Sequence, residues 1–415
     1  MKDRIAFLAF LGSALLLAFL YGFFSGKYAL FPHDTVTEIV TNAQILKEHW
    51  KNDFGVEPTR HLTEVPSDRQ RLTIDPEGPL APGNRIILGV VKDRETLFGA
   101  LLLDATGKER HFWPLPYEEV DPDGLAPQNV FPHGMAVLPS GSLILTFDGS
   151  SVMARISACG DVEWVQGGGH HVMFRSYDGT VWTLSTTIGK WHDFLLQLDP
   201  ETGDILKKID FQKDVLMAGR HNALLALNAE QSPDHLVQSS DPFHTNDLEV
   251  LSPALADAFP MFDAGDILLS FRHMNMLAVI DGGDYHLKWW KIGPWHRQHD
   301  PDFLPDGTIM VYDNNMSFGE SRILTIDPGT EVVSVAYEGT EEAPFYAYHR
   351  GKQQSLKNGN ILITDPVVGR GIEVTSEGRI VWEYQNIFDQ TRNGKLGNIQ
   401  LVPVDFFEEG ALDCP

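Results

Sequence analysis

Four histidines stand at the same place in four copies of one local pattern. Each begins a short apolar run, and in the copies of His133, His171 and His299 a turn glycine follows eight residues later. In the copy of His244 the turn comes late, because Ser252 to Phe262 interrupts the pattern. Imidazole is a nucleophile, a proton carrier and a metal ligand near neutral pH. If the four runs lie side by side, the sequence predicts a histidine-rich site.

Other polar side chains accompany these histidines. Asn246 lies two residues after His244, so both side chains point to one side of a strand. Arg272 ends the next strand of that hairpin, and its planar guanidinium can hold a tetrahedral anion. Asp300 follows His299 and can fix its tautomer, as can a backbone carbonyl. Three further candidates for substrate binding are Arg322, His349 and Arg350.

Two groups have structural alternatives. For Arg322 and Arg350 the alternative is an ion pair at the surface or between repeated units. Four histidines outside the shared register are expected to be structural, namely His192, His273, His286 and His296.

The histidine runs belong to a repeated hairpin unit. Gln298 to Asn315 shows its outline, in which two apolar runs flank a Pro-Asp-Gly turn, a strong hairpin signal. A second hairpin follows each first one, and six second hairpins occur between Leu101 and Tyr384. Six four-stranded units spaced by roughly 40 to 50 residues are typical of a β-propeller. The predicted fold is therefore all-β, a six-bladed β-propeller, with the histidine runs as the innermost strands.

The N-terminal part of the chain differs from the repeats. The run from Ile5 to Phe24 carries no charge and is long enough for a helix to cross the ~30 Å apolar core of a bilayer. Lys2 and Arg4 precede it, so the positive-inside tendency predicts a cytoplasmic N-terminus and an extracytoplasmic, periplasmic remainder. A cleaved signal peptide is the alternative. We predict a single-pass membrane protein whose residues 1–30 are an uncleaved anchor.

The remaining chain divides into two parts. Asp34 to Trp50 has apolar residues at helical spacing and is predicted to be an amphipathic helix. It belongs to a helical stalk and strap over residues 31–84, and a lid over one channel mouth is the alternative. The propeller is predicted over residues 85–415, where a strand from Ile399 to Val404 closes the ring with the N-terminal region.

Composition limits the partners. The chain has 415 residues with 32 Lys and Arg against 57 Asp and Glu, a net charge of −25. This charge argues against nucleic-acid binding, and an anionic ligand needs a locally basic pocket. Cys159 and Cys414 form no motif. A disulfide and two unpaired thiols are both open, and we favour the thiols. The sequence does not give the oligomeric state.

One stretch carries a family resemblance. QHDPDFLPDGTIMVYDNN followed by SRIL, with HTN and SFRH in the preceding unit, resembles the arylsulfotransferase family, and the resemblance covers Asn129 to Tyr384. It implies a six-bladed propeller that moves a sulfuryl group from an aryl sulfate ester to a phenolic acceptor, through a sulfohistidine and without a nucleotide, cofactor or metal. The chain departs from the family pattern in its shortness, its anchor and N-terminal region, and Asp313-Asn314-Asn315 where Asp-Asn-Gly is expected.

The resemblance also implies roles for the matched side chains. His299 would attack sulfur as a neutral imidazole. The groups implied to hold the sulfuryl oxygens or to supply a further imidazole are His244, Asn246 and Arg272, with His133 or His171. Sulfuryl transfer is comparable to phosphoryl transfer, in which catalysis consists mostly of positioning and charge stabilisation.

Two other functions are open on the sequence. The histidines could bind a divalent metal in a propeller hydrolase or lyase, although Arg272 is an unfavourable neighbour for a cation. A membrane-anchored binding propeller could keep the same channel without turnover. Metal analysis tests the first alternative, and an assay with a chromogenic aryl sulfate tests the second.

Overall fold

The computed structural model describes residues 2–187, 190–221, 223–224, 227, 229–231, 236–238 and 241–414. The chain forms two compact units, residues 1–60 and 61–415. In the first unit, α1 (Lys2–Tyr28) contains a stretch long and apolar enough to cross a membrane, a property that it shares with signal sequences. The predicted amphipathic helix is confirmed as α2 (His33–Asp53).

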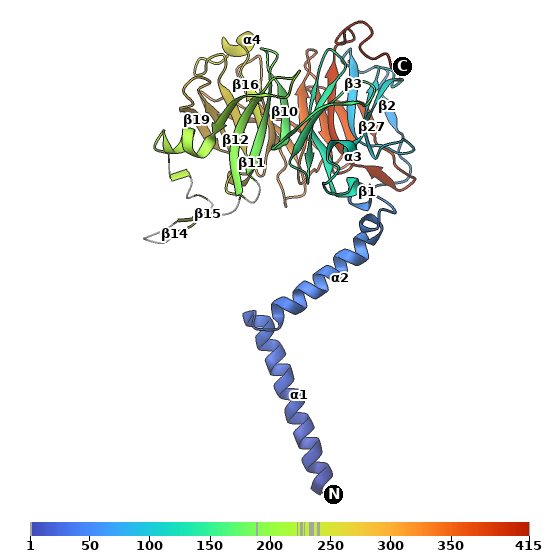
Figure 1. Ribbon diagram of the computed structural model, residues 1–415, viewed down its shortest axis with the longest axis vertical. Coiled ribbons are helices and arrows are strands. Elements are labelled where there is room, and N and C mark those ends of the chain that lie inside the picture. Colours follow the sequence, from blue (N-terminus) through green and yellow to red (C-terminus); the bar gives the residue numbers. More distant parts are fainter. Residues whose placement is uncertain are drawn as a thin grey trace. The chain divides into compact units, whose positions relative to one another are not determined.

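The second unit is a six-bladed β-propeller, which confirms the predicted fold. The strands of each blade are given from the inside outwards. Blade one consists of β29 (Leu396–Val402), β3 (Asn84–Val90), β4 (Phe98–Leu103) and β5 (Glu109–Leu115). Blade two consists of β6 (Phe131–Val137), β7 (Leu143–Asp148), β8 (Val152–Ile156) and β9 (Val162–Gly167). Blade three consists of β10 (Gly169–Arg175), β11 (Val181–Thr187), β12 (Lys190–Leu198) and β13 (Ile205–Asp210). Blade four consists of β16 (Thr245–Val250), β17 (Ile267–Phe271), β18 (Met276–Ile280) and β19 (Leu287–Ile292). Blade five consists of β20 (His299–Phe303), β21 (Ile309–Asp313), β22 (Arg322–Ile326) and β23 (Val333–Glu338). Blade six consists of β24 (Lys352–Ser355), β25 (Ile361–Asp365), β26 (Arg370–Val374) and β27 (Ile380–Gln385). Figure 1 shows the strands of the propeller from the side, with β10, β11, β12, β16 and β19 labelled on one side and β3 and β27 on the other.

The innermost strands form a closed circle. β29, β6, β10, β16, β20 and β24 each contact the next in this order, and β24 contacts β29. The predicted closing strand is confirmed as β29, which pairs antiparallel with β3 from Val402↔Asn84 to Leu396↔Gly89. The first blade is thus completed by the end of the chain.

The segment before the first blade adds strands to the ring. β2 (Leu72–Ile74) pairs with β27 and is a fifth, outermost strand of blade six. β1 (Leu62–Glu64) pairs with β28 (Arg392–Gly394). The remaining short elements are η1 (Thr59–His61), α3 (Tyr117–Val120), η2 (Pro127–Asn129), η3 (Phe211–Met217), β14 (Ala229–Gln231), β15 (Leu236–Gln238), α4 (Pro253–Ala256) and η5 (Arg272–Met274).

Apolar packing between blades holds the ring together. Central strands are covered on both faces, and all five residues of β18 (MLAVI) are buried for this reason. Among the described residues, six apolar clusters fill the six interfaces between neighbouring blades. Such blades cannot bury both faces alone, so the ring is stable only when closed.

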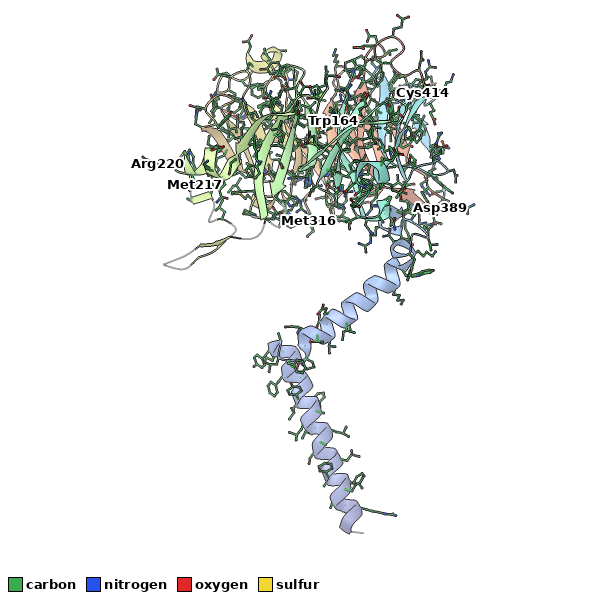
Figure 2. The ribbon with its side chains drawn as sticks, in the orientation of Figure 1. Trp164, Met217, Arg220, Met316, Asp389 and Cys414 are labelled. Atoms are coloured by element: carbon green, nitrogen blue, oxygen red, sulfur yellow. A yellow bond between two sulfur atoms is a disulfide. The ribbon has the colours of Figure 1, made fainter. Side chains whose placement is uncertain are left out.

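A disulfide joins Cys159, in the turn between β8 and β9, to Cys414 near the end of the chain. The expectation of unpaired thiols is therefore wrong. Figure 2 shows Cys414 on one rim of the propeller and Met316, from the loop after β21, on the opposite rim. The bridge fixes the tail that follows β29 onto blade two.

Candidate functional site

The inner strands are irregular where they begin. Pairing with the next strand shifts register near the start of β6, β10, β16, β20 and β29. His171, His244 and Arg350 have φ values of 60°, 49° and 59°, outside the range of ordinary strands. A Cβ on Gly134 would lie 2.3 Å from the carbonyl oxygen of His171, so only glycine permits this approach. Bulges of this kind re-aim side chains, and here they accompany the predicted site residues.

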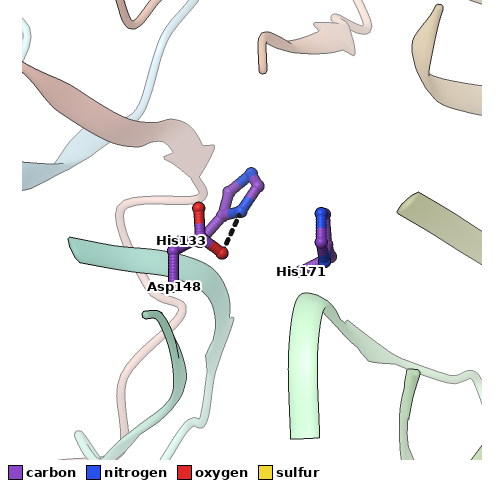
Figure 3. Close-up of side chains that lie close together, drawn as sticks. All are labelled: His133, Asp148 and His171. Atoms are coloured by element: carbon purple, nitrogen blue, oxygen red, sulfur yellow. Dashed lines mark hydrogen bonds and ion pairs between the residues drawn. The ribbon is translucent and has the colours of Figure 1, made fainter. Parts of the chain in front are cut away.

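Three predicted histidines from three consecutive blades lie side by side. The ring centroids of His133 and His171 are 5.2 Å apart, and those of His171 and His244 are 5.1 Å apart. Figure 3 shows His133, Asp148 and His171, with a 3.0 Å hydrogen bond between His133 Nδ1 and Asp148. His170 Nδ1 lies 2.6 Å from His171 Nδ1, so one of these nitrogens donates and the other accepts. We call this end of the channel the histidine mouth, defined by His133, His171, His244 and His299.

The contacts of His299 fix its tautomer. Asn314 donates both amide hydrogens to backbone carbonyls, those of Ala347 at 2.7 Å and Arg350 at 2.6 Å. Its carbonyl oxygen therefore faces His299 Nδ1, at 2.6 Å, and the Arg297 carbonyl lies 3.1 Å from the same nitrogen. Both partners are acceptors, so Nδ1 carries the hydrogen. The lone pair of His299 is consequently on Nε2.

His299 is neutral at pH 7. Burial lowers its pKa well below the ordinary value of 6.5, and the positive charge of Arg272 lowers it further. The hydrogen bond with Asn314 opposes this shift without outweighing it. Burial also lowers the pKa of His171 well below 6.5. Neutral imidazoles thus collect at the histidine mouth.

His244, like His133, is hydrogen-bonded with a carboxylate. Its Nδ1 hydrogen-bonds with Asp241, and its backbone N–H donates to the same side chain at 2.9 Å. Burial raises the pKa of Asp241, but the hydrogen bond and charge of His244 outweigh it and the pKa lies below 3.8. His273, expected to be structural, stacks on His244 at 4.6 Å and hydrogen-bonds with the Asp241 carbonyl at 2.9 Å.

Asn246 and Arg272 lie close to these histidines. The amide of Asn246 is buried and donates to the carbonyl of Gln298, across the interface of blades four and five, at 2.8 Å. Arg272 begins η5, and its backbone N–H donates to the backbone carbonyl of His244. The guanidinium of Arg272 lies 3.7 Å from the sulfur of Met316. Two predicted side chains thus accompany His244 and His299.

Arg350 and His349 lie at the start of blade six. Arg350 donates to Asp148 at 2.8 and 3.1 Å, so it is paired with the carboxylate that holds His133. Burial, followed by the charge of Arg350, lowers the pKa of His349 to about 3. The ion pair anticipated as an alternative for Arg350 exists, and it lies at the histidine mouth.

Two predicted side chains have other partners. Arg322 donates to Asp313 at 3.0 Å, and Asp313 also accepts from the backbone N–H of His296 at 2.8 Å, so the ion pair anticipated as an alternative for Arg322 exists. The carboxylate of Asp300 accepts from Lys352 at 2.6 Å rather than from His299. The backbone carbonyl, the other predicted partner of His299, is present at Arg297. The side chain of His192 lies outside the described residues.

Asp300 belongs to a cavity of about 340 Å³ deeper in the channel. Four acids and a lysine line part of this cavity, namely Asp247, Glu249, Asp300, Asp302 and Lys352. Burial raises the pKa of Asp247 to about 7 and that of Glu249 to about 8. The acidic channel interior therefore contrasts with the histidine mouth.

Sequence reasoning missed several residues at the mouth. Asn314 stands in the quoted Asp-Asn-Asn motif, but the sequence alone does not show what its amide contacts. Asp148 ends β7 and Asp241 lies three residues before His244. His61 and Lys395 belong to no repeated pattern, and tertiary contacts alone bring them here.

Two groups of side chains at the mouth have nitrogen or oxygen atoms within 4.8 Å of one another, as metal ligands do. The first group is His133, Asp148 and His171, and the second is Asp241, His244 and His273. Asp148 is also paired with Arg350. A guanidinium bonded to a ligand competes with a metal ion for the same carboxylate.

The fold and the site define a β-propeller that gathers imidazoles, guanidinium groups and hydrogen-bonded carboxylates at one end of its channel. The chain matches the arylsulfotransferase (ASST) family over residues 134–387, more than half of its length, and it belongs to that family. A search of curated proteins finds no match.

Solved structures resemble the chain remotely. A protein of unknown function from Bacteroides caccae has 12% identity and a TM-score of 0.49, covering 77% of this chain and 98% of that chain. TolB from Acinetobacter baumannii has 11% identity and a TM-score of 0.47, covering 77% and 67%. Virginiamycin B lyase from Staphylococcus aureus has 12% identity and a TM-score of 0.39, covering 64% and 73%. These similarities are too remote to bear on function.

Proposed function

We propose that the protein transfers a sulfuryl group from an aryl sulfate ester to a phenolic acceptor, through a sulfohistidine at Nε2 of His299. The observation that carries this proposal is the fixed tautomer of His299, whose Nδ1 is bonded to two acceptors. Its buried, neutral ring near Arg272 is suited to attack an anionic sulfate ester. Membership of the arylsulfotransferase family supports the reaction class.

In the first half-reaction, the Nε2 lone pair of His299 attacks sulfur while the bond from sulfur to the aryl oxygen breaks. The leaving phenolate takes a proton from His244, whose Nδ1 is hydrogen-bonded with the Asp241 carboxylate. In the second half-reaction, His244 takes the proton of the acceptor phenol, whose oxygen attacks sulfur. The bond from sulfur to Nε2 then breaks, and both imidazoles return to their first state.

Charge stabilisation is assigned to groups that surround the sulfuryl oxygens. Arg272 supplies a permanent positive charge, and its proximity is seen in the lowered pKa of His299. Asn246 uses an amide N–H for the Gln298 carbonyl, which leaves the other for a sulfuryl oxygen. His133 and His171 complete the proposed set, because their rings continue the line from His244.

Aromatic side chains offer a surface for the aryl group. Tyr348 is 41% exposed, and its ring centroid lies 4.4 Å from that of His349. Phe318 is 71% exposed and lies 5.7 Å from His296 in the loop that also holds Met316. Many different phenols can stack on such rings, because every aryl group has a π face.

The adduct itself tests the proposal. Full-length protein in detergent is mixed with 4-nitrophenyl sulfate without acceptor, quenched and measured by intact mass. Wild type should gain one acid-labile sulfuryl group, and His299→Ala should gain none. His286→Ala, which removes an exposed histidine bonded to Asp284, is the matched control and should be labelled like wild type. Turnover without an adduct, or near-normal activity of His299→Ala, would refute the covalent route.

A metal-dependent hydrolase or lyase is the second candidate, favoured by the ligand-like group of His133, Asp148 and His171. Its ion would have to displace Arg350 from Asp148. Elemental analysis of the purified protein and activity after chelation separate the candidates. Loss of activity on chelation with recovery on adding a divalent metal supports the hydrolase, and activity unaffected by chelation supports sulfuryl transfer.

The membrane orientation is part of the proposal. The apolar helix α1 supports an anchor, and Lys2 and Arg4 at its start support a cytoplasmic N-terminus with the propeller on the periplasmic side. We place the donor and acceptor phenols on that side.

A further inference from the structure

The six inner strands begin with two kinds of side chain. At or next to the start of β6, β10, β16 and β20 stand the imidazoles of the histidine mouth. Just before β24 and β29 stand Arg350 and Lys395, which are basic. Equivalent positions in a closed ring of blades face one axis. One side of the mouth is therefore imidazole and the other is cationic.

Direct contacts connect this cationic side. The backbone N–H of Lys395 donates to the carbonyl of His61 at 2.8 Å. The ring of His61 lies 5.3 Å from that of Phe131, and the guanidinium of Arg350 lies 4.3 Å from the centre of the same Phe131 ring. Arg350 and Lys395 both lower the pKa of His349, so its imidazole lies near both cations. We call Arg350, Lys395, His349 and His61 the cationic wall.

Two buried nitrogens of the cationic wall have no hydrogen-bond partner in the described structure, and these are Nε2 of His61 and Nδ1 of His349. His61 is 93% buried, since its exposed fraction is 7%. A buried polar atom without a partner costs stability unless a ligand or water satisfies it. In the tautomer that places the hydrogen on such a nitrogen, the imidazole donates to an oxyanion, which the two neighbouring cations also attract.

The sulfuryl group does not need this wall, because the proposed reaction centre is formed by His299, His244 and Arg272. We propose that the cationic wall binds a second oxyanion, such as a carboxylate, carried on the aromatic ring of the substrate. This inference rests on the proposed function for the identity of the reaction and deepens it by naming the substrate class as anionic phenols and their sulfate esters. Arg350 of the wall also pairs with Asp148.

Binding tests the inference without turnover. The probes are 4-hydroxybenzoate and its neutral isostere 4-hydroxybenzamide, titrated into full-length protein in detergent by calorimetry. A charge-assisted hydrogen bond predicts that wild type binds the carboxylate about tenfold to a hundredfold more tightly. Lys395→Gln should abolish this difference and Lys395→Arg should keep it. Lys108→Gln, in an exposed turn, makes the same change in net charge and should behave like wild type.

The outcomes separate this inference from the proposed function. Equal binding of the two probes by wild type, or an unchanged preference in Lys395→Gln, overturns the cationic subsite. Selective binding of 4-hydroxybenzoate without any sulfuryl transfer would keep the subsite and refute the proposed function. With 4-carboxyphenyl sulfate and 4-carbamoylphenyl sulfate as donors, kcat/KM should show the same preference in wild type and lose it in Lys395→Gln.

Discussion

The hydrogen on His299 is held at Nδ1 because the amide of Asn314 has no freedom to turn. Both of its N–H groups are bonded to carbonyls of the segment that enters blade six, which leaves only its oxygen for the imidazole. A neutral partner fixes the tautomer without stabilising the imidazolium as a carboxylate would. The nucleophile therefore stays neutral over a wider pH range.

The pH profile should reflect this environment. Because the pKa of His299 in the folded protein lies well below 6.5, the neutral form persists at pH 6.5 and is lost only at lower pH. We expect the acid limb of kcat/KM to lie well below pH 6.5. Asn314→Asp places a carboxylate beside Nδ1, so its acid limb should move to higher pH. A wild-type limb at or above pH 6.5 would contradict the assigned nucleophile.

Arg272 is expected to act through geometry as well as charge. Arg272→Lys keeps the charge but loses the planar set of donors, and the loss of one such group lowers the rate by about 10² to 10³. The measurement is kcat with 4-nitrophenyl sulfate and phenol. Arg379→Lys, at an exposed arginine paired with Asp75, is the matched control and should keep wild-type activity. Equal rates for Arg272→Lys and wild type would remove Arg272 from the reaction.

At the scale of elements, the start of each inner strand decides where a side chain points. A regular strand alternates its side chains between two faces. The register shifts at the start of β6, β10, β16 and β20 interrupt that alternation at or beside the predicted histidines. Packing between blades must therefore hold these strand ends firmly for the imidazoles to remain in line.

The interface between blades six and one contains a buried ion pair between Arg85 of β3 and Glu373 of β26, both fully buried. Glu373→Gln leaves Arg85 without its counter-charge, and we expect the free energy of unfolding in urea to fall by about 3–5 kcal/mol. Arg85→Met combined with Glu373→Gln should recover part of this loss, because no buried charge then remains.

An exposed pair provides the control for this interface. Arg94 and Glu109 are each about two-fifths exposed, so Glu109→Gln should change stability by no more than about 1 kcal/mol. If Glu373→Gln were as mild as Glu109→Gln, the buried pair would not stabilise the closed ring.

At the scale of the whole molecule, the disulfide bears on the cell compartment in which the propeller lies. Cys159 and Cys414 are 255 residues apart, and their bridge joins blade two to the tail behind the closing strand. Disulfides persist in oxidising compartments and are rare in the cytoplasm. The bridge therefore agrees with the proposed placement of the propeller outside the cytoplasm.

Thiol labelling in cells checks this placement. Cells are lysed in denaturant containing a maleimide polymer, with or without prior reduction. We expect no label without reduction and two labels after it, because both cysteines are paired outside the cytoplasm. Cys414→Ser should take up one label without reduction. Two labels on unreduced wild type would place the propeller in the reducing cytoplasm.

The sequence alone was sufficient for the six-bladed ring and for the line of histidines. Both depend on local patterns, since a turn glycine at a constant distance from a histidine repeats one hairpin and a repeated hairpin cannot bury its faces alone. The amphipathic helix and the closing strand are likewise visible in apolar spacing. Local chemistry therefore predicted the blades and placed His133, His171, His244 and His299 at equivalent positions.

Only the tertiary structure decided which partner each polar group has. Arg322 and Asp300 are candidates by residue type, and only the structure shows that their partners are Asp313 and Lys352. The disulfide, which joins cysteines 255 residues apart, was not predicted from the sequence, which favoured unpaired thiols. Contacts between chain segments distant in sequence depend on ring closure, and no local pattern specifies them. For the same reason Lys395 comes to the histidine mouth only when the last strand completes the first blade.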